Sequence, residues 1–194
     1  MNAIADLLSA LSDTNPNRRA CAAEEIFQRG SERAREAITP WLQDTELKSV
    51  FFLGTDGFPE MTVGAAVRPD TFEVIHEAMG KPALADVPPE HETREFEVIF
   101  PGGVRLDILT TLGSKGAGAI ARYLGKFGEG IQQVELLCRS VDRATSLLRE
   151  RFSLAPVYPE TRAGANRTRV NFLLVPAAEE GKLLIELVEP PSRQ

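Results

Sequence analysis

Residues 133–152 read QVELLCRSVDRATSLLRERF and are followed by VNFLLV at 170–175 and KLLIEL at 182–187. The alternating apolar runs predict strands, and the run that begins at Ser140 has the helical spacing and N-cap of a helix over about 140–152. The preceding residues repeat this order, with TVGAAV at 62–67, a predicted helix over 69–79, FEVIF at 96–100 and VRLDIL at 104–109. The sequence therefore predicts two copies of one β-α-β-β-β unit, at about 60–110 and 131–189.

The spacing within the two copies supports the duplication. Thr62 and Glu90 are 28 residues apart, and Gln133 and Glu160 are 27 apart, while the later hairpins of the second copy are longer by four and five residues. Differences of that size belong in loops. One copy is too small to close a core alone, so we expect the two to pair as curved sheets with a ligand-binding cleft between them. The predicted fold class is α+β, with paired βαβββ modules.

Residues 1–46 have a different, helical pattern and form the predicted N-terminal extension to a domain at 47–194. Asn15 and Pro16 predict a helix start, Gly30 predicts its end, and Ser31 predicts the start of a third helix that buries Trp41. This pattern looks like a single HEAT-type repeat, which would need to pack on the rest of the chain or on a partner. The first β-rich run after it is SVFFL at 49–53.

Composition excludes several classes of protein. The chain has 194 residues, 43% of them hydrophobic, and a net charge of −6, without any stretch basic enough for a nucleic-acid footprint. No apolar run approaches the length of a membrane span, and Asp6 interrupts the only stretch that resembles a secretion signal. We therefore expect a cytoplasmic protein without nucleic-acid or membrane partners. Cys21 and Cys138 are too isolated for a disulfide framework or thiolate metal site and are expected to be buried.

Two longer stretches carry a resemblance to a known family. LTTLGSKGAGAIARYLGKFGEGIQQVELLCRSVDRA at 109–144 and NRTRVNFLLVPAAEEGKLLIELVEPP at 166–191 resemble the C-terminal half of the methylmalonyl-CoA epimerases. These belong to the vicinal oxygen chelate superfamily, with glyoxalase I and the bleomycin-resistance proteins. The resemblance is strongest over about 104–191, looser over 60–103, and absent over 1–59. It implies the glyoxalase-like fold and a divalent metal held by strand residues of both modules.

The metal ligands that the resemblance implies fall on Thr62, Asp107, Gln133 and Glu186. Two of the family's ligands are histidines, and both are replaced here, at Thr62 and Gln133. The chain's own histidines, His76 and His91, lie in a predicted helix and a predicted loop. A site with oxygen donors alone does not suit zinc, iron or cobalt. We therefore expect a degenerate metal site with no tightly bound cofactor, or with a weakly held Mg, Ca or Mn cation.

The resemblance also implies a pair of proton-transferring glutamates. One matches Glu186 and the other falls at Glu97, although Glu95 shares the same strand face and leaves the register open by two residues. Asn171 is the mirror position of Glu97 in the second module and is predicted to bind ligand. Arginines near the AGANR loop are candidates for binding a CoA phosphate: Arg162, Arg167 and Arg169. The glycine-rich run GSKGAGA at 113–119 is interpreted as a flexible linker between the modules.

Two functions follow from these residues. The first is an isomerase of the epimerase type that acts on a small carboxylate or an acyl-CoA, with Glu97 and Glu186 exchanging protons. The second is a non-catalytic binding module of the same fold, whose N-terminal helices dock a partner or form a homodimer. Asp107 and Glu186 favour the enzyme, whereas the missing histidines favour the binding module.

Overall fold

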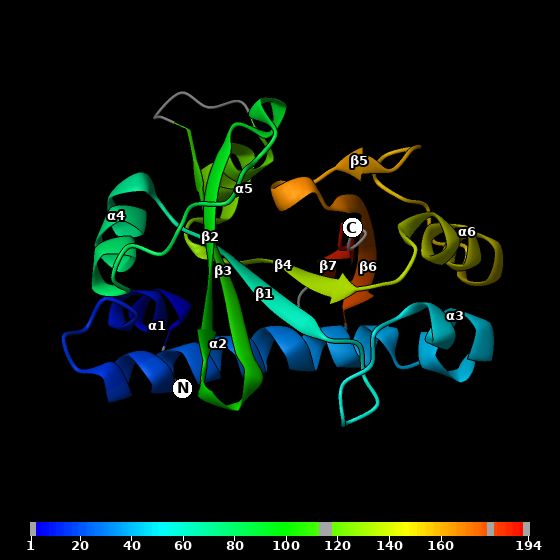
Figure 1. Ribbon diagram of the computed structural model, residues 1–194, viewed down its shortest axis with the longest axis horizontal. Coiled ribbons are helices and arrows are strands. Elements are labelled where there is room, and N and C mark those ends of the chain that lie inside the picture. The colour runs from blue at the N-terminus through cyan, green and yellow to red at the C-terminus, as the bar shows by residue number, and fades with distance from the viewer. Residues whose placement is uncertain (1–2, 113–117, 178–180, 192–194) are drawn as a thin grey trace. The chain divides into compact units, whose positions relative to one another are not determined.

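The computed structural model describes residues 3–112, 118–177 and 181–191 (Figure 1). Its helices are α1 (Ile4–Ala10), α2 (Pro16–Ile38), α3 (Thr45–Val50), α4 (Pro69–Ala78), α5 (Ala119–Phe127) and α6 (Val141–Phe152). Its strands are β1 (Met61–Ala66), β2 (Thr93–Phe100), β3 (Val104–Thr111), β4 (Gly130–Leu137), β5 (Arg162–Ala163), β6 (Arg169–Ala177) and β7 (Gly181–Glu189). No helix among these residues combines the length and apolarity needed to cross a bilayer.

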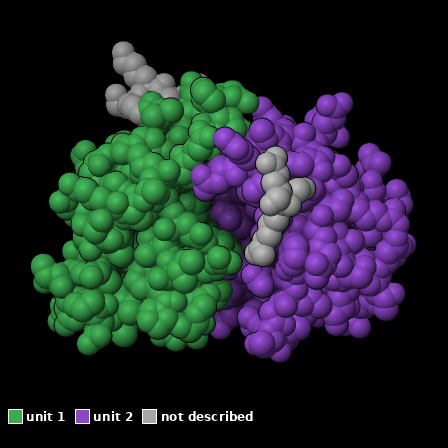
Figure 2. Space-filling model, in the orientation of Figure 1, with its two compact units in different colours: residues 1–30, 62–132 green, residues 31–61, 133–194 purple. Residues whose placement is uncertain are grey.

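The chain divides into two compact units, shown in different colours in Figure 2. Unit 1 consists of residues 1–30 and 62–132, and unit 2 consists of residues 31–61 and 133–194. Each unit therefore combines one β-rich module with part of the N-terminal segment.

Unit 1 contains a three-stranded sheet in the order β2-β3-β1. β2 and β3 form an antiparallel hairpin, and β1 lies parallel to β3. Side chains on one face of this sheet, among them Val63, Leu106 and Phe96, are fully buried. Phe72 of α4 packs edge-on against Phe96, so α4 contributes to the core on this face.

Unit 2 repeats this arrangement with strands in the order β4-β7-β6-β5. β6 and β7 are antiparallel, and β4 is parallel to β7. α6 packs against β6 and β7, and its Leu147 and Leu148 are fully buried, as are Ile185 and Leu187 of β7. The Ser140 hydroxyl accepts a hydrogen bond from the Arg143 amide and caps α6, as predicted.

The shared order of strands confirms the predicted fold class. β1, α4, β2 and β3 correspond in sequence order and pairing to β4, α6, β6 and β7. The strand register agrees as well. Gly64 of β1 is paired with Asp107 of β3, and at the equivalent position of the second module Glu135 of β4 is paired with Glu186 of β7. The two modules are copies of one β-rich unit, although the described residues form the predicted β-α-β-β-β order only in the second, where β5 has two residues, and β-α-β-β in the first.

The N-terminal segment differs from its prediction. Asn15 and Pro16 begin a helix as expected, with the Asn15 side chain accepting from the Asn17 amide. Gly30 does not end that helix and Ser31 does not begin another, because α2 continues without a break to Ile38. One long helix stands where two were predicted, and the HEAT-type repeat is not confirmed.

The reason for the glycine at position 30 is packing. A Cβ atom built on Gly30 would lie 2.7 Å from both methyl carbons of Val63, a contact that real side chains do not make. Gly30 therefore lets α2 approach β1 within unit 1. A glycine costs a helix interior only about 1 kcal/mol, which such packing can offset.

Two further elements were predicted incorrectly or missed. SVFFL is not a strand: Ser49 and Val50 end α3, whose start is capped by Asp44, and only Phe51 and Leu53 form isolated bridges. α5 was missed, although Ile120, Tyr123, Leu124 and Phe127 have the i, i+3, i+4, i+7 spacing of a helix. The start of the presumed linker, residues 113–117, lies outside the described residues, and Ala119 already belongs to α5.

Candidate functional site

Gln133 and Glu186 form a buried polar contact on the sheet of unit 2. Gln133 lies near the start of β4 and donates a hydrogen bond from Nε2 to Glu186 Oε2 on β7. Glu186 is 8% exposed and Gln133 is 6% exposed. A buried carboxylate held by an N–H donor has a fixed orientation. The structure therefore brings together the two residues of unit 2 that were predicted at the metal site.

Glu135 is a third member of this contact that sequence analysis missed. Its Oε1 lies 3.4 Å from Gln133 Nε2, and it is the register partner of Glu186. Gln133 and Glu135 are two residues apart on one strand, so alternation alone would have placed them on the same face. We define Gln133, Glu135 and Glu186 as the carboxylate–amide cluster.

The side chains beside this cluster are apolar. Phe172 on β6 is the register partner of Glu186, and Leu174 is the partner of Leu184 one step along the same face. The Tyr158 ring packs edge-on against Phe172. This face of unit 2 therefore presents a polar group next to apolar surface, which suits a ligand with a carboxylate or thioester and an apolar part.

Asn171 does not join this face. It is the register partner of Leu187, so its side chain leaves the sheet on the opposite side from that of Glu186. Asn171 is 1% exposed, and its amide donates to the Tyr158 carbonyl oxygen. The prediction that Asn171 is the mirror of Glu97 is therefore wrong, because that position in the second module is Phe172, one residue further along.

In unit 1, the predicted residues share one face of the sheet. Glu97 on β2 is paired with Asp107 on β3, and Asp107 is also paired with Gly64 on β1. Thr62 lies two residues before Gly64 and therefore on the same face. Asp107 is 7% exposed, whereas Glu97 is exposed and forms an ion pair with Arg105 at 3.2 Å. Asp107 is the mirror of Glu186, as predicted.

Glu95 has surroundings different from those of Glu97. It is paired with Leu109, which packs in an apolar cluster with Ala66 and with Ile120 of α5. Burial in these surroundings raises the pKa of Glu95 from 4.5 to about 7. Glu95 is therefore a carboxyl group that changes its charge near neutral pH.

The three arginines near the AGANR loop have different surroundings. Arg169 forms ion pairs with Asp142 and with Glu189 at 3.1 Å, and these carboxylates raise its pKa. Arg169 therefore stabilises the end of unit 2. Arg167 is exposed and has a φ of 63°, an unusual left-handed conformation for an arginine. Arg162 stacks over the Tyr158 ring at 4.5 Å.

The residues present do not fit the metal that the fold family implies. Gln133 donates an N–H hydrogen bond to the Glu186 carboxylate. An N–H group has no lone pair to offer a metal ion, so it takes up an acceptor oxygen of Glu186 without itself being a metal ligand. Among the described residues, no three His, Cys, Asp or Glu side chains are grouped closely enough to hold a metal ion. His76 is packed between Phe72 and Phe96 and bonds the Pro82 carbonyl, away from the sheet face of Asp107.

The cysteines contribute no reactive group to this site. Cys138 is buried, and its desolvation together with the Glu189 carboxylate raises its pKa to about 12, which keeps the thiol protonated. Cys21 was expected to be buried and is instead exposed, on α2.

Comparison with known proteins supports the fold. No protein-family model matches the chain, and no curated protein sequence matches it significantly. Among solved structures, methylmalonyl-CoA epimerase of Mycobacterium tuberculosis is 29% identical, with a TM-score of 0.54 over 68% of this chain and 87% of that one. A hypothetical protein of Bacillus halodurans is 21% identical, with a TM-score of 0.54 over 69% and 94% of the two chains.

A third similar structure holds a ligand. It is a methylmalonyl-CoA epimerase in complex with methylmalonyl-CoA and NH4+, 21% identical, with a TM-score of 0.53 over 70% of this chain and 96% of that one. At such identities the last two likenesses establish the fold alone. The chain has the glyoxalase-like fold of the vicinal oxygen chelate proteins.

Proposed function

We propose that this protein is an epimerase-like isomerase that binds a small carboxylate or an acyl-CoA and moves a proton at the carbon beside its carbonyl group. The observation that carries the proposal is the carboxylate–amide cluster: Glu186 is buried and held by Gln133 at a position that matches a proton-transferring glutamate of the epimerases. The similarity to methylmalonyl-CoA epimerase at 29% identity supports the same class of substrate.

The proposed chemistry needs a base, an acid and a means of holding negative charge. Glu186 removes the proton, and the amide of Gln133 keeps its carboxylate oriented during the transfer. A second carboxyl group returns a proton to the opposite face of the carbon. Glu97 was predicted for this role, but the pKa of about 7 favours Glu95, because a group that is partly protonated at neutral pH both accepts and donates protons.

No step of this proposal uses a metal ion. The donor set of Thr62, Asp107, Gln133 and Glu186 lacks imidazole, so we propose that the protein holds no cofactor tightly, or at most a weak Mg, Ca or Mn cation.

Solvent-deuterium exchange into methylmalonyl-CoA, followed by mass spectrometry, tests the proposal. We expect exchange in the wild type and a loss of about 100-fold or more in Glu186→Gln, since a positioned base contributes about 10² to 10⁴ in rate. Glu150→Gln is a matched control, because Glu150 is exposed on α6 of the same unit. An active wild type with equally active Glu186→Gln would place the chemistry elsewhere.

The same assay identifies the second carboxylate. Glu95→Gln and Glu97→Gln remove a charge from the same strand face two residues apart. We expect Glu95→Gln to lower the exchange rate far more than Glu97→Gln. The reverse order would return the role to Glu97.

A non-catalytic binding module is the second candidate function. It is favoured by Thr62 and Gln133, which stand where the epimerases have histidines. This alternative predicts calorimetric binding of methylmalonyl-CoA without deuterium exchange in the wild type. The N-terminal helices then serve to dock a partner or a second copy, which sedimentation of the full chain detects.

A further inference from the structure

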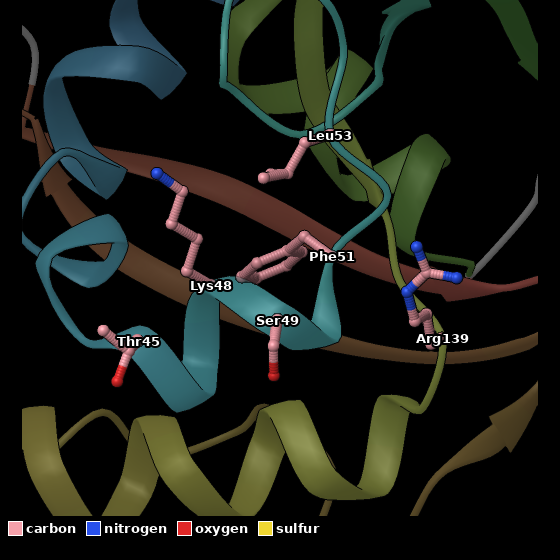
Figure 3. A pocket seen from close by; sticks show the side chains of 6 residues that line it. All are labelled: Thr45, Lys48, Ser49, Phe51, Leu53 and Arg139. Atoms are coloured by element: carbon pink, nitrogen blue, oxygen red, sulfur yellow. The ribbon is translucent and has the colours of Figure 1, made fainter.

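An open pocket with a volume of about 450 Å³ lies in unit 2, next to α3 and the end of β4. It is lined by Thr45, Lys48, Ser49, Phe51, Leu53 and Arg139 (Figure 3). The side chains of Lys48 and Arg139 lie on either side of Phe51, and Leu53 lies beyond them on the side away from α6. Two cations around an apolar centre suit an anionic group that is attached to an apolar body.

The two cations differ from the neighbouring arginines in their charge partners. Arg143 and Arg151 of α6 form ion pairs with Glu46, and Arg151 also pairs with Asp44. Within the described parts of the chain, no carboxylate lies within ion-pair distance of Lys48 or Arg139. Asp44 and Glu46 are therefore bound to the α6 arginines, and the charges of Lys48 and Arg139 remain available to a ligand.

Arg139 is also held in place. Its guanidinium lies 4.2 Å from the centroid of the Phe52 ring, and its amide donates to the Val50 carbonyl oxygen. Stacking uses the flat face of the guanidinium, so the N–H groups at its edge can still donate to a phosphate or carboxylate. A preoriented cation loses less entropy when an anion binds.

Arg139 of the pocket follows the strand that carries two residues of the carboxylate–amide cluster. Gln133 and Glu135 share a face of β4, which ends at Leu137, and Arg139 follows two residues after that end. At about 3.3 Å per residue in an extended chain, the backbones of Glu135 and Arg139 are at most about 13 Å apart. The pantetheine arm of coenzyme A has a chain of about 13 bonds between sulfur and phosphorus, which spans about 15 Å when extended, as four to five residues do.

We infer that this Lys48–Arg139 pocket binds the phosphorylated nucleotide end of a coenzyme A ester whose acyl end lies at Gln133 and Glu186. The phosphates bind Lys48 and Arg139, and the base packs against Leu53, which is 37% exposed. This inference rests on the proposed function for its substrate class. Lys48 and Leu53 belong to the segment before residue 60, which the sequence resemblance to the epimerases does not reach, whereas Arg139 lies inside the resembling stretch.

Calorimetric titration with adenosine 3′,5′-bisphosphate tests the pocket without any activity assay. We expect Lys48→Gln and Arg139→Gln each to weaken binding about 10-fold or more, as the loss of a charge-assisted hydrogen bond does. Arg149→Gln removes the same charge from an exposed arginine of α6 outside the pocket lining and is expected to bind like the wild type. Lys48→Arg is expected to retain most of the affinity.

The exchange assay adds a second readout. For methylmalonyl-CoA, we expect Lys48→Gln and Arg139→Gln to raise KM about 10-fold while kcat changes little. For methylmalonyl-pantetheine, which lacks the nucleotide, we expect wild type and variants to have equal KM values. Equal effects of the variants on both substrates would overturn the inference.

Three outcomes separate this inference from the proposed function. If Arg167→Gln weakens bisphosphate binding and the pocket variants do not, the phosphates bind at the AGANR loop and the inference is wrong. If inorganic phosphate binds as tightly as the bisphosphate, the pocket is a general anion site and the inference is again wrong. If the pocket variants lose bisphosphate binding but the wild type exchanges no deuterium, the pocket is supported and the isomerase proposal fails.

Discussion

Glu95 and Glu97 are identical side chains on the same face of β2, and their surroundings decide what each can do. Glu97 is exposed and paired with Arg105, whereas Glu95 is the register partner of Leu109, which packs against Ile120 of α5. Alternation places both on one face, but it cannot tell which is desolvated, because desolvation depends on the segments that pack over the strand. The raised pKa of Glu95 is a consequence of tertiary packing.

We expect this raised pKa to make stability depend on pH. Between about pH 4.5 and pH 7 the folded chain binds more protons at Glu95 than the unfolded chain does, so the free energy of unfolding falls as pH rises through this window. Glu95→Gln removes this contribution and should be more stable than the wild type at pH 8 by about 1 kcal/mol or more, since one pKa unit corresponds to about 1.4 kcal/mol. Urea unfolding at pH 4.5 and pH 8 measures both effects.

Glu97→Gln is the matched control for this prediction. Its carboxylate is exposed, and we expect its unfolding free energy to follow that of the wild type at both pH values. If Glu95→Gln keeps the full pH slope of the wild type, Glu95 is not the group that responds to burial.

Asn171 was assigned to the position that mirrors Glu97, and the assignment is in error by one residue. A shift of one position along β6 moves a side chain to the other face of the sheet. Glu97 is the second residue of FEVIF and Asn171 is the second residue of VNFLL, and this match made Asn171 the mirror of Glu97. Backbone pairing instead gives Phe172 as the neighbour of Glu186.

At the scale of elements, the glycines inside α2 and α5 have opposite roles. A Cβ atom built on Gly30 of α2 would lie 2.7 Å from the methyl carbons of Val63, whereas a Cβ atom built on Gly125 of α5 would have no heavy atom of another segment within 4 Å. The sequence signal is the same in both, because a glycine inside a helical pattern resembles a helix end. Only the neighbouring strand distinguishes a packing glycine from a dispensable one.

We expect Gly30→Ala to destabilise the protein by about 1–3 kcal/mol, because overpacking outweighs the gain in helix propensity. Gly125→Ala, the matched control, should stabilise it by about 0.5–1 kcal/mol. Thermal and urea unfolding measure both changes. In a double-mutant cycle, Val63→Ala should relieve part of the Gly30→Ala loss, and strictly additive effects would argue against the contact.

At the scale of the whole molecule, the donor set predicts the metal content. Protein purified without added metal is expected to carry no stoichiometric zinc, cobalt or iron, since Thr62 and Gln133 supply no imidazole. Elemental analysis after chelation is the measurement, with a Thr62→His, Gln133→His double variant as the comparison that restores two imidazoles. One transition-metal ion per wild-type chain that survives chelation would contradict this prediction.

The sequence by itself determined the duplicated β-rich modules, the helices α4 and α6, and the placement of Asp107 and Glu186 at mirrored positions. These are local properties, because alternation, helical spacing and caps are properties of short segments. Tertiary structure decided the continuity of α2 through Gly30, the burial of Glu95, the Gln133–Glu186 contact and the pocket between Lys48 and Arg139. Each of these depends on side chains that meet from segments distant in the chain, and their meeting is set by packing and register, which no single segment encodes.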